Sequence, residues 1–202
     1  MNNPVNLATG RRGFLGLGAG IAATAALGAC TVSKSGNVTT VTLNVAEIKD
    51  YGQAGLNAVT LVLSIAAVAS AIGTPAVGVI SLADTALSTA LTSFSTAAGS
   101  TLTITYDDTN WKSRVDSILS DLTTLQTDLT AAITGASTKV SSADLTNANT
   151  ALSALGTVVS AFKGVLDSVA TRRNVGAMAA AAVPPSKAQV QQALQVLGVT
   201  AG

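Results

Sequence analysis

Residues 111–132 read WKSRVDSILSDLTTLQTDLTAA, and this stretch decides the fold. Its apolar residues recur at alternating spacings of four and three, which is the heptad pattern of a helix that packs along one stripe. Polar and charged residues fill the other positions, as on a helix face that meets water. The pattern therefore predicts a long amphipathic helix. Its stripe consists of Trp111, Val115, Ile118, Leu122, Leu125, Leu129 and Ala132.

A second stripe of the same kind follows after a short link at 135–140. Ser141 and Asp144 have the spacing of a capping box, with Asp in place of Glu, and they predict where this helix begins. Because the link is short, we expect the two helices to pack as an antiparallel pair. The second stripe consists of Leu145, Ala148, Leu152, Leu155, Val159, Phe162, Leu166 and Val169.

The chain before these two helices predicts two more. Asn44 is suited to cap a helix from 45 to about 72, with Glu47 in its first turn. We expect this helix to end at the Gly-Thr-Pro sequence of residues 73–75. A further helix is expected from 76 to about 99. Together with the pair above, these segments make four helices.

Shorter elements complete the predicted fold. Two runs rich in β-branched residues, 38–44 and 101–106, can pair as a small ribbon. A final helix is expected at 186–197, with Val190, Leu194 and Leu197 on one stripe. The sequence thus predicts a mainly α fold: an antiparallel four-helix bundle with a short C-terminal helix and a two-stranded β-ribbon. The expected divisions are a leader (1–29), a polar tether (30–44), the bundle (45–173), an Ala/Pro linker (174–185) and a C-terminal helix and tail (186–202).

The leader carries an export signal. Arg11 and Arg12 precede Phe14 and Leu15, and a Gly/Ala-rich apolar run follows. This run is too short and too rich in glycine for a permanent membrane span, which needs about 20 apolar residues. The pattern Arg-Arg-x-Phe-Leu resembles the twin-arginine export signal, and the resemblance implies translocation to the periplasm or cell surface. The alternative is an ordinary secretory signal that happens to contain two arginines.

The leader ends in Leu27, Gly28, Ala29 and Cys30, and Cys30 is the only cysteine in the chain. These four residues resemble the lipobox of bacterial lipoproteins. The resemblance implies cleavage before Cys30 and acylation of that residue, so that membrane lipid becomes a partner. Thr31, in place of the Asp that retains such proteins at the inner membrane, favours an outer membrane where the cell has one. The alternative is a small apolar cysteine near a plain cleavage site.

Composition restricts the chemistry that the chain can perform. There is no histidine, so the sequence excludes Ser–His–Asp and Cys–His sites and lacks the commonest metal ligand. Without Arg11 and Arg12, nine basic residues face ten acidic ones, which gives no basic surface for nucleic acid. Asp107 and Asp108 could ligate a hard cation, but adjacent acids at a helix start are typical of caps. We therefore predict no catalytic, cofactor or metal site, and an enzyme using carboxylates alone is disfavoured.

Residues 51–83 contain no charge. One interpretation is a buried hairpin at the centre of the bundle, because a helix that is apolar all round belongs in a core. The other is a membrane-inserting hairpin at 54–83, which resembles, at the level of fold, helical pore-forming toxins. Asp84 ends this stretch and falls on the stripe between Ile80 and Leu87, so it is either a buried polar residue that fixes register or a group that reaches solvent.

These features predict an exported, lipid-anchored cell-envelope protein that acts as a non-enzymatic structural or interaction module. Its partner is expected to be a second copy or another envelope protein. The alternative is a membrane-active protein that inserts the hairpin at 54–83.

Overall fold

The computed structural model of this chain describes residues 30–35, 38–106, 109–170 and 184–200. The leader residues Arg11 to Ala29 and the pair Asp107–Asp108 lie outside the described residues. The elements, in chain order, are β1 (Cys30–Ser35), β2 (Val38–Asn44), α1 (Val45–Ser64), α2 (Ala66–Ala98), β3 (Thr103–Thr105), α3 (Thr109–Ala136), α4 (Ser142–Ala170) and α5 (Lys187–Val196).

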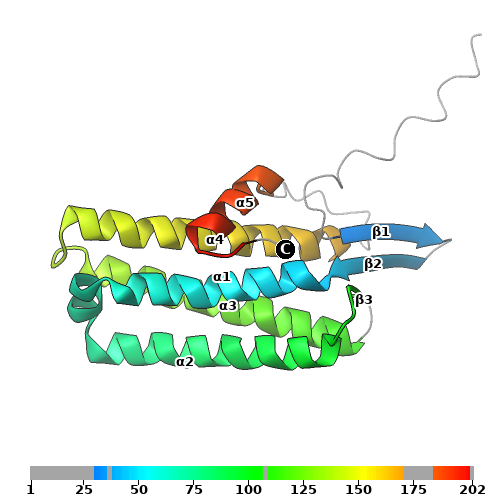
Figure 1. Ribbon diagram of the computed structural model, residues 1–202, viewed down its shortest axis with the longest axis horizontal. Coiled ribbons are helices and arrows are strands. Elements are labelled where there is room, and N and C mark those ends of the chain that lie inside the picture. Colours follow the sequence, from blue (N-terminus) through cyan, green and yellow to red (C-terminus); the bar gives the residue numbers. More distant parts are fainter. Residues whose placement is uncertain (1–29, 36–37, 107–108, 171–183, 201–202) are drawn as a thin grey trace, which may run out of the picture.

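The four long helices form an antiparallel bundle, as predicted (Figure 1). Consecutive helices are neighbours, and α4 closes the bundle against α1. The short helix α5 packs chiefly on α4 and also touches α1. The small sheet lies at the end of the bundle where α1 begins. The predicted mainly α fold class is confirmed.

The heptad stripe of α3 forms the middle of the core. Val115, Ile118, Leu122, Leu125 and Leu129 are completely buried, and Trp111 is half-buried with its ring edge-on to Phe94. The described side chains of the α4 stripe are also buried or half-buried. In addition α4, which packs on α1, α3 and α5, buries a second set of residues: Ala151, Ala154, Val158, Ala161 and Val165.

The predicted helix starts at Asn44 and Ser141 both have a side-chain cap. The Asn44 Oδ1 accepts from the backbone N–H groups of Ala46 and Glu47, at 2.8 and 3.4 Å, and so starts α1. At the start of α4 the Asp144 N–H donates to the Ser141 Oγ at 3.2 Å. The end of α1, however, differs from the prediction.

The first helix was expected to continue to residue 72, and it ends at Ser64 instead. Ile65 has an extended backbone conformation, φ −76° and ψ 95°, that breaks the helix. A short helical piece follows and is itself interrupted at Gly73, whose φ of 76° lies in the left-handed region that glycine adopts without strain. Pro75, which lacks an N–H group, follows two residues later. The predicted break at 73–75 is therefore real, but a second break precedes it.

The sheet has three strands in the order β1-β2-β3, all antiparallel. The predicted ribbon is the β2–β3 pair, in which Leu43 lies opposite Ile104. The expectation of a polar tether before residue 38 is wrong for residues 30–35, because they form β1 and pair with β2. A strand in this position satisfies the backbone groups of the second edge of β2, which would otherwise be unpaired.

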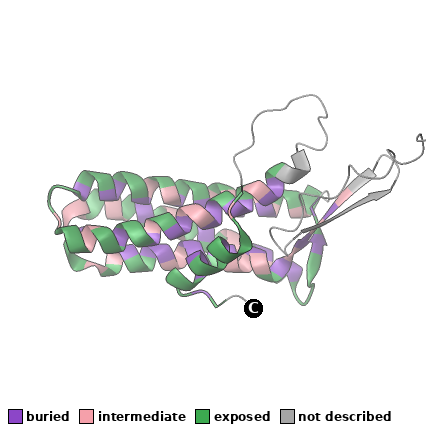
Figure 2. Cartoon of the chain, turned by 90° about the horizontal axis from the view of Figure 1, so that it is seen from above, coloured by how far each residue is buried: buried purple, intermediate pink, exposed green. Residues whose placement is uncertain are grey.

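Two glycines let α1 approach its neighbours closely. A Cβ on Gly52 would lie 2.7 Å from the Leu91 Cδ1, and one on Gly55 would lie 2.4 Å from the Leu122 Cδ2. Buried residues line the sides of the helices that face one another (Figure 2). Most residues of α2 are exposed or half-buried. Among the described side chains, no polar or charged residue is buried. The core is therefore apolar. Of the two helices in the first half of the chain, α1 is more deeply buried than α2.

Candidate functional site

Cys30, the predicted acylation site, is the first residue of β1 and pairs with Leu43 of β2. Leu43 is buried, and α1 begins two residues after it. The other residues of the predicted signal and lipobox, Arg11, Arg12, Phe14, Leu15, Leu27, Gly28 and Ala29, lie outside the described residues. Cys30 therefore stands at the edge of the folded body, with no described free segment between it and the sheet.

Of the two interpretations of Asp84, a buried register residue or a group that reaches solvent, its partial exposure favours the second. Its side chain is partly exposed, between the fully buried Ile80 and Leu87. The reason is that α2 is an outer helix with a narrow buried stripe that recurs every seven residues, at Ile80, Leu87 and Phe94. Asp84 falls at the border of that stripe, where partial burial raises the pKa of its carboxyl group.

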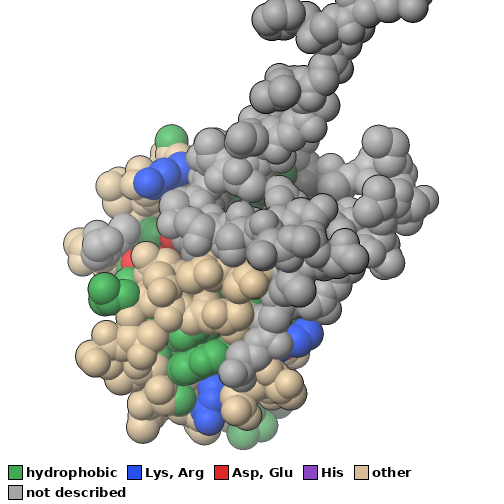
Figure 3. Space-filling view, turned by 90° about the vertical axis from the view of Figure 1, so that its right-hand side faces the viewer, with side chains coloured by type: hydrophobic (Ala, Val, Ile, Leu, Met, Phe, Trp, Pro, Cys, Tyr) green, Lys and Arg blue, Asp and Glu red, His purple; other side chains and the backbone are tan. Residues whose placement is uncertain are grey.

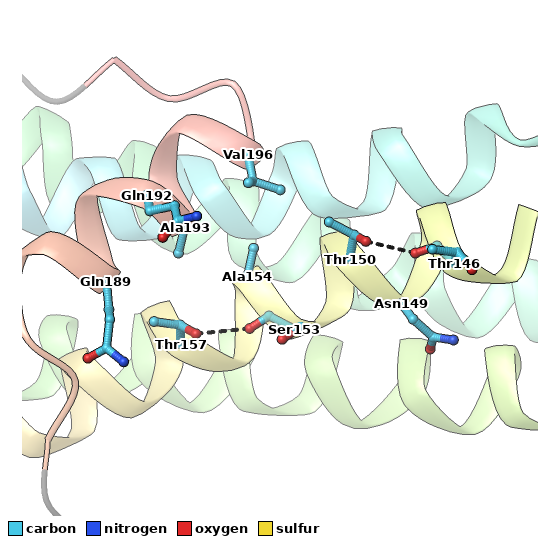
Figure 4. Close-up of a pocket in the computed structure, with 10 residues that line it drawn as sticks. All are labelled: Thr146, Asn149, Thr150, Ser153, Ala154, Thr157, Gln189, Gln192, Ala193 and Val196. Atoms are coloured by element: carbon cyan, nitrogen blue, oxygen red, sulfur yellow. Dashed lines mark hydrogen bonds between the residues drawn. The ribbon is translucent and has the colours of Figure 1, made fainter. Parts of the chain in front are cut away.

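One recess lies between α4 and α5 and has a volume of about 510 Å³ (Figure 4). Hydroxyl and amide side chains dominate its lining, and none of the lining residues carries a charge or a thiol. The Thr150 and Thr157 hydroxyls donate to the carbonyl oxygens of Thr146 and Ser153, at 2.8 and 3.1 Å. The residues that line it are Thr146, Asn149, Thr150, Ser153, Ala154, Thr157, Gln189, Gln192, Ala193 and Val196.

This recess can offer hydrogen bonds, but its lining holds no group suited to act as an acid, base or nucleophile near neutral pH. A second recess of about 560 Å³ lies on the other side of the same α4 ridge and shares Asn149, Ser153 and Thr157 with it. Sequence reasoning missed both. The walls of the first recess depend on where α5 docks, and those of the second on how α3 and α4 pack beside Pro185. An isolated Thr, Asn or Gln gives no signal in the sequence.

Two small groups of titratable residues lie near the sheet end. Tyr51 donates its hydroxyl hydrogen to the Glu47 carboxylate. Burial is the main cause that raises the pKa of Glu47, while the hydrogen bond from Tyr51 and the charge of Lys187 oppose the rise. Both residues belong to α1, and Tyr51 stacks at a tilt on Phe162 of α4. This group ties α1 to the helices that pack over it.

The second group joins β3 to α3. The Tyr106 hydroxyl donates to the Asp116 Oδ1 at 2.5 Å, and Lys112 forms an ion pair with the same carboxylate. Burial, and then the bond to Asp116, raise the pKa of Tyr106. Within the described residues, no group of three acidic, histidine or cysteine side chains is arranged to hold a metal ion. On the sheet end, the visible Lys and Arg side chains are scattered singly (Figure 3).

The third feature is the apolar character of α2. Of the described helices, it is the one long and apolar enough to cross a membrane by length and composition. Only 11% of its most apolar window is buried inside the bundle. Val79 and Leu82 are 52% and 74% exposed. For the uncharged stretch, the interpretation as core therefore fits α1 and does not fit α2.

No known protein family, no curated protein and no solved structure matches this chain.

Proposed function

We propose that this chain is an exported, lipid-anchored protein of the cell envelope that acts as a non-enzymatic structural or interaction module. The observation that carries the proposal is the position of Cys30. This sole cysteine ends a pattern that resembles a lipobox, and the first strand of the folded body begins at the same residue. Cleavage before Cys30 would leave every described helix and strand intact.

Acylation of Cys30 would hold the sheet end of the bundle at a membrane. Each buried CH₂ group contributes about 0.8 kcal/mol, so several acyl chains give a lasting anchor. Because residues 30–35 form a strand, the sheet would lie close to the lipid surface. The helix α1 is 20 residues long and leads away from the sheet. Its length of about 30 Å puts the corner between α1 and α2 at the opposite end (Figure 1).

A non-enzymatic role is supported by the chemistry of the side chains. The chain has no histidine, and hydroxyl and amide groups dominate the described recesses. Such surfaces suit contact with another molecule better than proton transfer. The partner in this proposal is a second copy of the chain or another envelope protein.

Labelling with tritiated palmitate tests the anchor. The parent chain should incorporate the label, and the Cys30→Ser variant should not. A matched variant, Ser33→Cys with Cys30→Ser, keeps a cysteine in β1 but moves it three residues away from the lipobox pattern, and it should also stay unlabelled. Equal labelling of Cys30→Ser and the parent would refute the anchor.

The export route has its own test. Replacing Arg11 and Arg12 together by Lys should abolish export if the leader is a twin-arginine signal, because that pathway reads the arginine pair. A plain secretory signal would tolerate the change, since Lys keeps the positive charge. Export of the double variant at the parental level would therefore favour the plain signal.

A membrane-active protein is the second candidate function, and the exposure of α2 favours it. The hairpin 54–83 as a whole is a poor inserting unit, because Ala54, Ala58 and Val62 of α1 are completely buried in the core. Residues 66–83 of α2 are more available, because Val68 and Ile80 alone are buried among them. Release of a trapped dye from vesicles by the parent chain tests this candidate, and an absence of release would count against it.

A further inference from the structure

The outward side of α2 presents apolar groups to solvent in the half of the helix away from the sheet. We call this surface the outer face of α2. Its two large apolar side chains, Val79 and Leu82, are 52% and 74% exposed. Leu61 of α1 is 40% exposed and lies at about the same height along the bundle as Leu82. The helices α1 and α2 are antiparallel, and Gly52 lies against Leu91. Leu61 is nine residues after Gly52, and Leu82 is nine residues before Leu91. The outer face consists of Gly78, Val79, Ser81, Leu82, Thr85 and Ala86.

The outer face carries no charge. Residues 51–83 contain none, and the first charged residue after them, Asp84, lies at the border of the buried stripe with its side chain partly shielded. A surface without charge has no electrostatic attraction for anionic or cationic partners. In addition, no charged group has to lose its water when this surface moves into an apolar medium.

The threonine hydroxyls on and beside the outer face, and that of Ser64, bond to backbone carbonyls of their own helices. The Thr85 hydroxyl donates to the Ser81 carbonyl and the Thr89 hydroxyl to the Thr85 carbonyl, each at 2.8 Å. Ser64, at the end of α1, donates to the Leu61 carbonyl at 2.8 Å. Donors bonded in this way do not need water, so an apolar surrounding leaves them with a partner. The threonine methyl groups then add to the apolar surface.

The opposite side of α2 holds the bundle together. Ile80, Leu87 and Phe94 are at most 1% exposed, and α2 packs extensively on α3 and α1. Full insertion of α2 into a bilayer would tear this stripe from the core. Contact through the outer face alone leaves the core intact, with one apolar side towards lipid, as for helices that lie in the membrane interface.

We propose that the outer face of α2 contacts the interfacial region of a lipid bilayer while the bundle stays folded. This proposal rests on the membrane-active candidate above, and it is independent of acylation at Cys30. Together with an acylated Cys30, it would give the bundle two separate attachments to lipid. Contact of this kind does not require anionic lipid, because the outer face has no positive charge that would attract it.

A second copy of the chain is a weaker candidate for the same face. A stable protein interface buries roughly 800 Å² on each partner and usually contains aromatic or arginine anchors. The outer face offers Val79 and Leu82 as its only large apolar side chains, and the rest are Gly, Ala, Ser and Thr. Lipid has no such requirement for shape, so a face of two aliphatic side chains among small residues suits lipid better than it suits a second copy.

The test uses residues 30–202 with Cys30→Ser, which contains every described element and cannot be acylated at that site. Its binding to phosphatidylcholine vesicles is measured by flotation. Leu82→Asp puts a charge on the outer face, and Leu102→Asp puts the same charge on a side chain 81% exposed just before β3, at the other end of the bundle. We expect Leu82→Asp to lower the partition coefficient at least tenfold, and Leu102→Asp to leave it unchanged. Equal circular dichroism spectra show that all the variants fold.

Four results would overturn the proposal. The first is that the parent does not bind vesicles, and the second is that the two substitutions have the same effect on binding. The third is that binding requires anionic lipid and weakens with salt. The fourth is that the protein forms a dimer in solution and that Leu82→Asp dissociates it. Binding can also be accompanied by loss of the near-ultraviolet circular dichroism signal of Trp111. That result would indicate that the bundle opens and inserts, and it would exclude contact by the folded bundle. That result would leave the membrane-active candidate standing. The palmitate experiment decides separately on the anchor.

Discussion

A Cβ atom on Gly55 of α1 would lie 2.4 Å from the Cδ2 of Leu122 in α3, closer than real Cβ contacts come. The same Cβ would lie 2.7 Å from the Leu87 Cδ2 of α2. Leu87 and Leu122 are both completely buried. The point where α1, α2 and α3 meet is therefore built around the missing side chain of Gly55.

Gly55→Val should destabilise the protein. Overpacking of a filled core costs about 1–3 kcal/mol, and the gain in helix propensity over glycine does not offset it. Gly78→Ala is the matched control, because nothing lies within 4 Å of its Cβ position on the exposed side of α2. We expect this variant to gain about 0.5–1 kcal/mol. The free energies of unfolding come from urea titrations followed by circular dichroism, and equal values for the two variants would contradict this packing.

Asn57 should control how firmly α5 is attached. Its Nδ2 donates to the carbonyl oxygen of Leu197 at 2.8 Å, a bond between residues 140 positions apart. Its Oδ1 accepts from the Gln53 Nε2 at 2.9 Å, which orients the amide. Asn57→Ala should cost about 1 kcal/mol and speed amide exchange in α5.

Gln53→Ala is the control for Asn57→Ala, since it removes the orienting bond and leaves the bond to Leu197 possible. We expect it to have the smaller effect on exchange in α5. Exchange rates at Val190 and Leu194 that are the same in the parent and in Asn57→Ala would show that the buried apolar side of α5 holds this helix without Asn57.

Glu47 should make stability depend on pH. Burial raises its pKa in the folded protein above the ordinary value of 4.5. The folded state then holds its proton more tightly than the unfolded state. The stabilisation is fully present below about pH 4.5 and is lost as the pH rises through the folded pKa.

Glu47→Gln should remove the contribution of Glu47 to this slope, because Gln does not titrate and its carbonyl can still accept the Tyr51 hydroxyl. The measurement is the free energy of unfolding of both proteins from pH 4 to pH 7. A slope in this range that is identical in the variant and the parent would rule out Glu47 as its source.

The sequence predicts the helices well where a stripe of large side chains is continuous. The heptads of α3 and α4 locate the core, and the predicted start of the last helix at 186 agrees with the position of Ser186 as the N-cap of α5. Such features are local, so they can be recognised without knowledge of the neighbours.

Features that depend on neighbours could not be predicted. The break at Ile65 lies inside an apolar run with no glycine or proline at that position. Strand β1 contains a single large apolar residue, Val32, and owes its existence to the edge of β2. Composition made α1 and α2 look alike, but Gly52 and Gly55 allow α1 to take the enclosed position and leave α2 outside.

The central claim of the proposed function is a lipid anchor at Cys30, and the mass of the N-terminal peptide from the protein in its native membrane tests it most directly. A lipid anchor at this residue predicts a chain that begins at Cys30 and carries the added mass of diacylglycerol and an N-terminal acyl group. A chain with the leader still attached, a different first residue or an unmodified Cys30 thiol would contradict it.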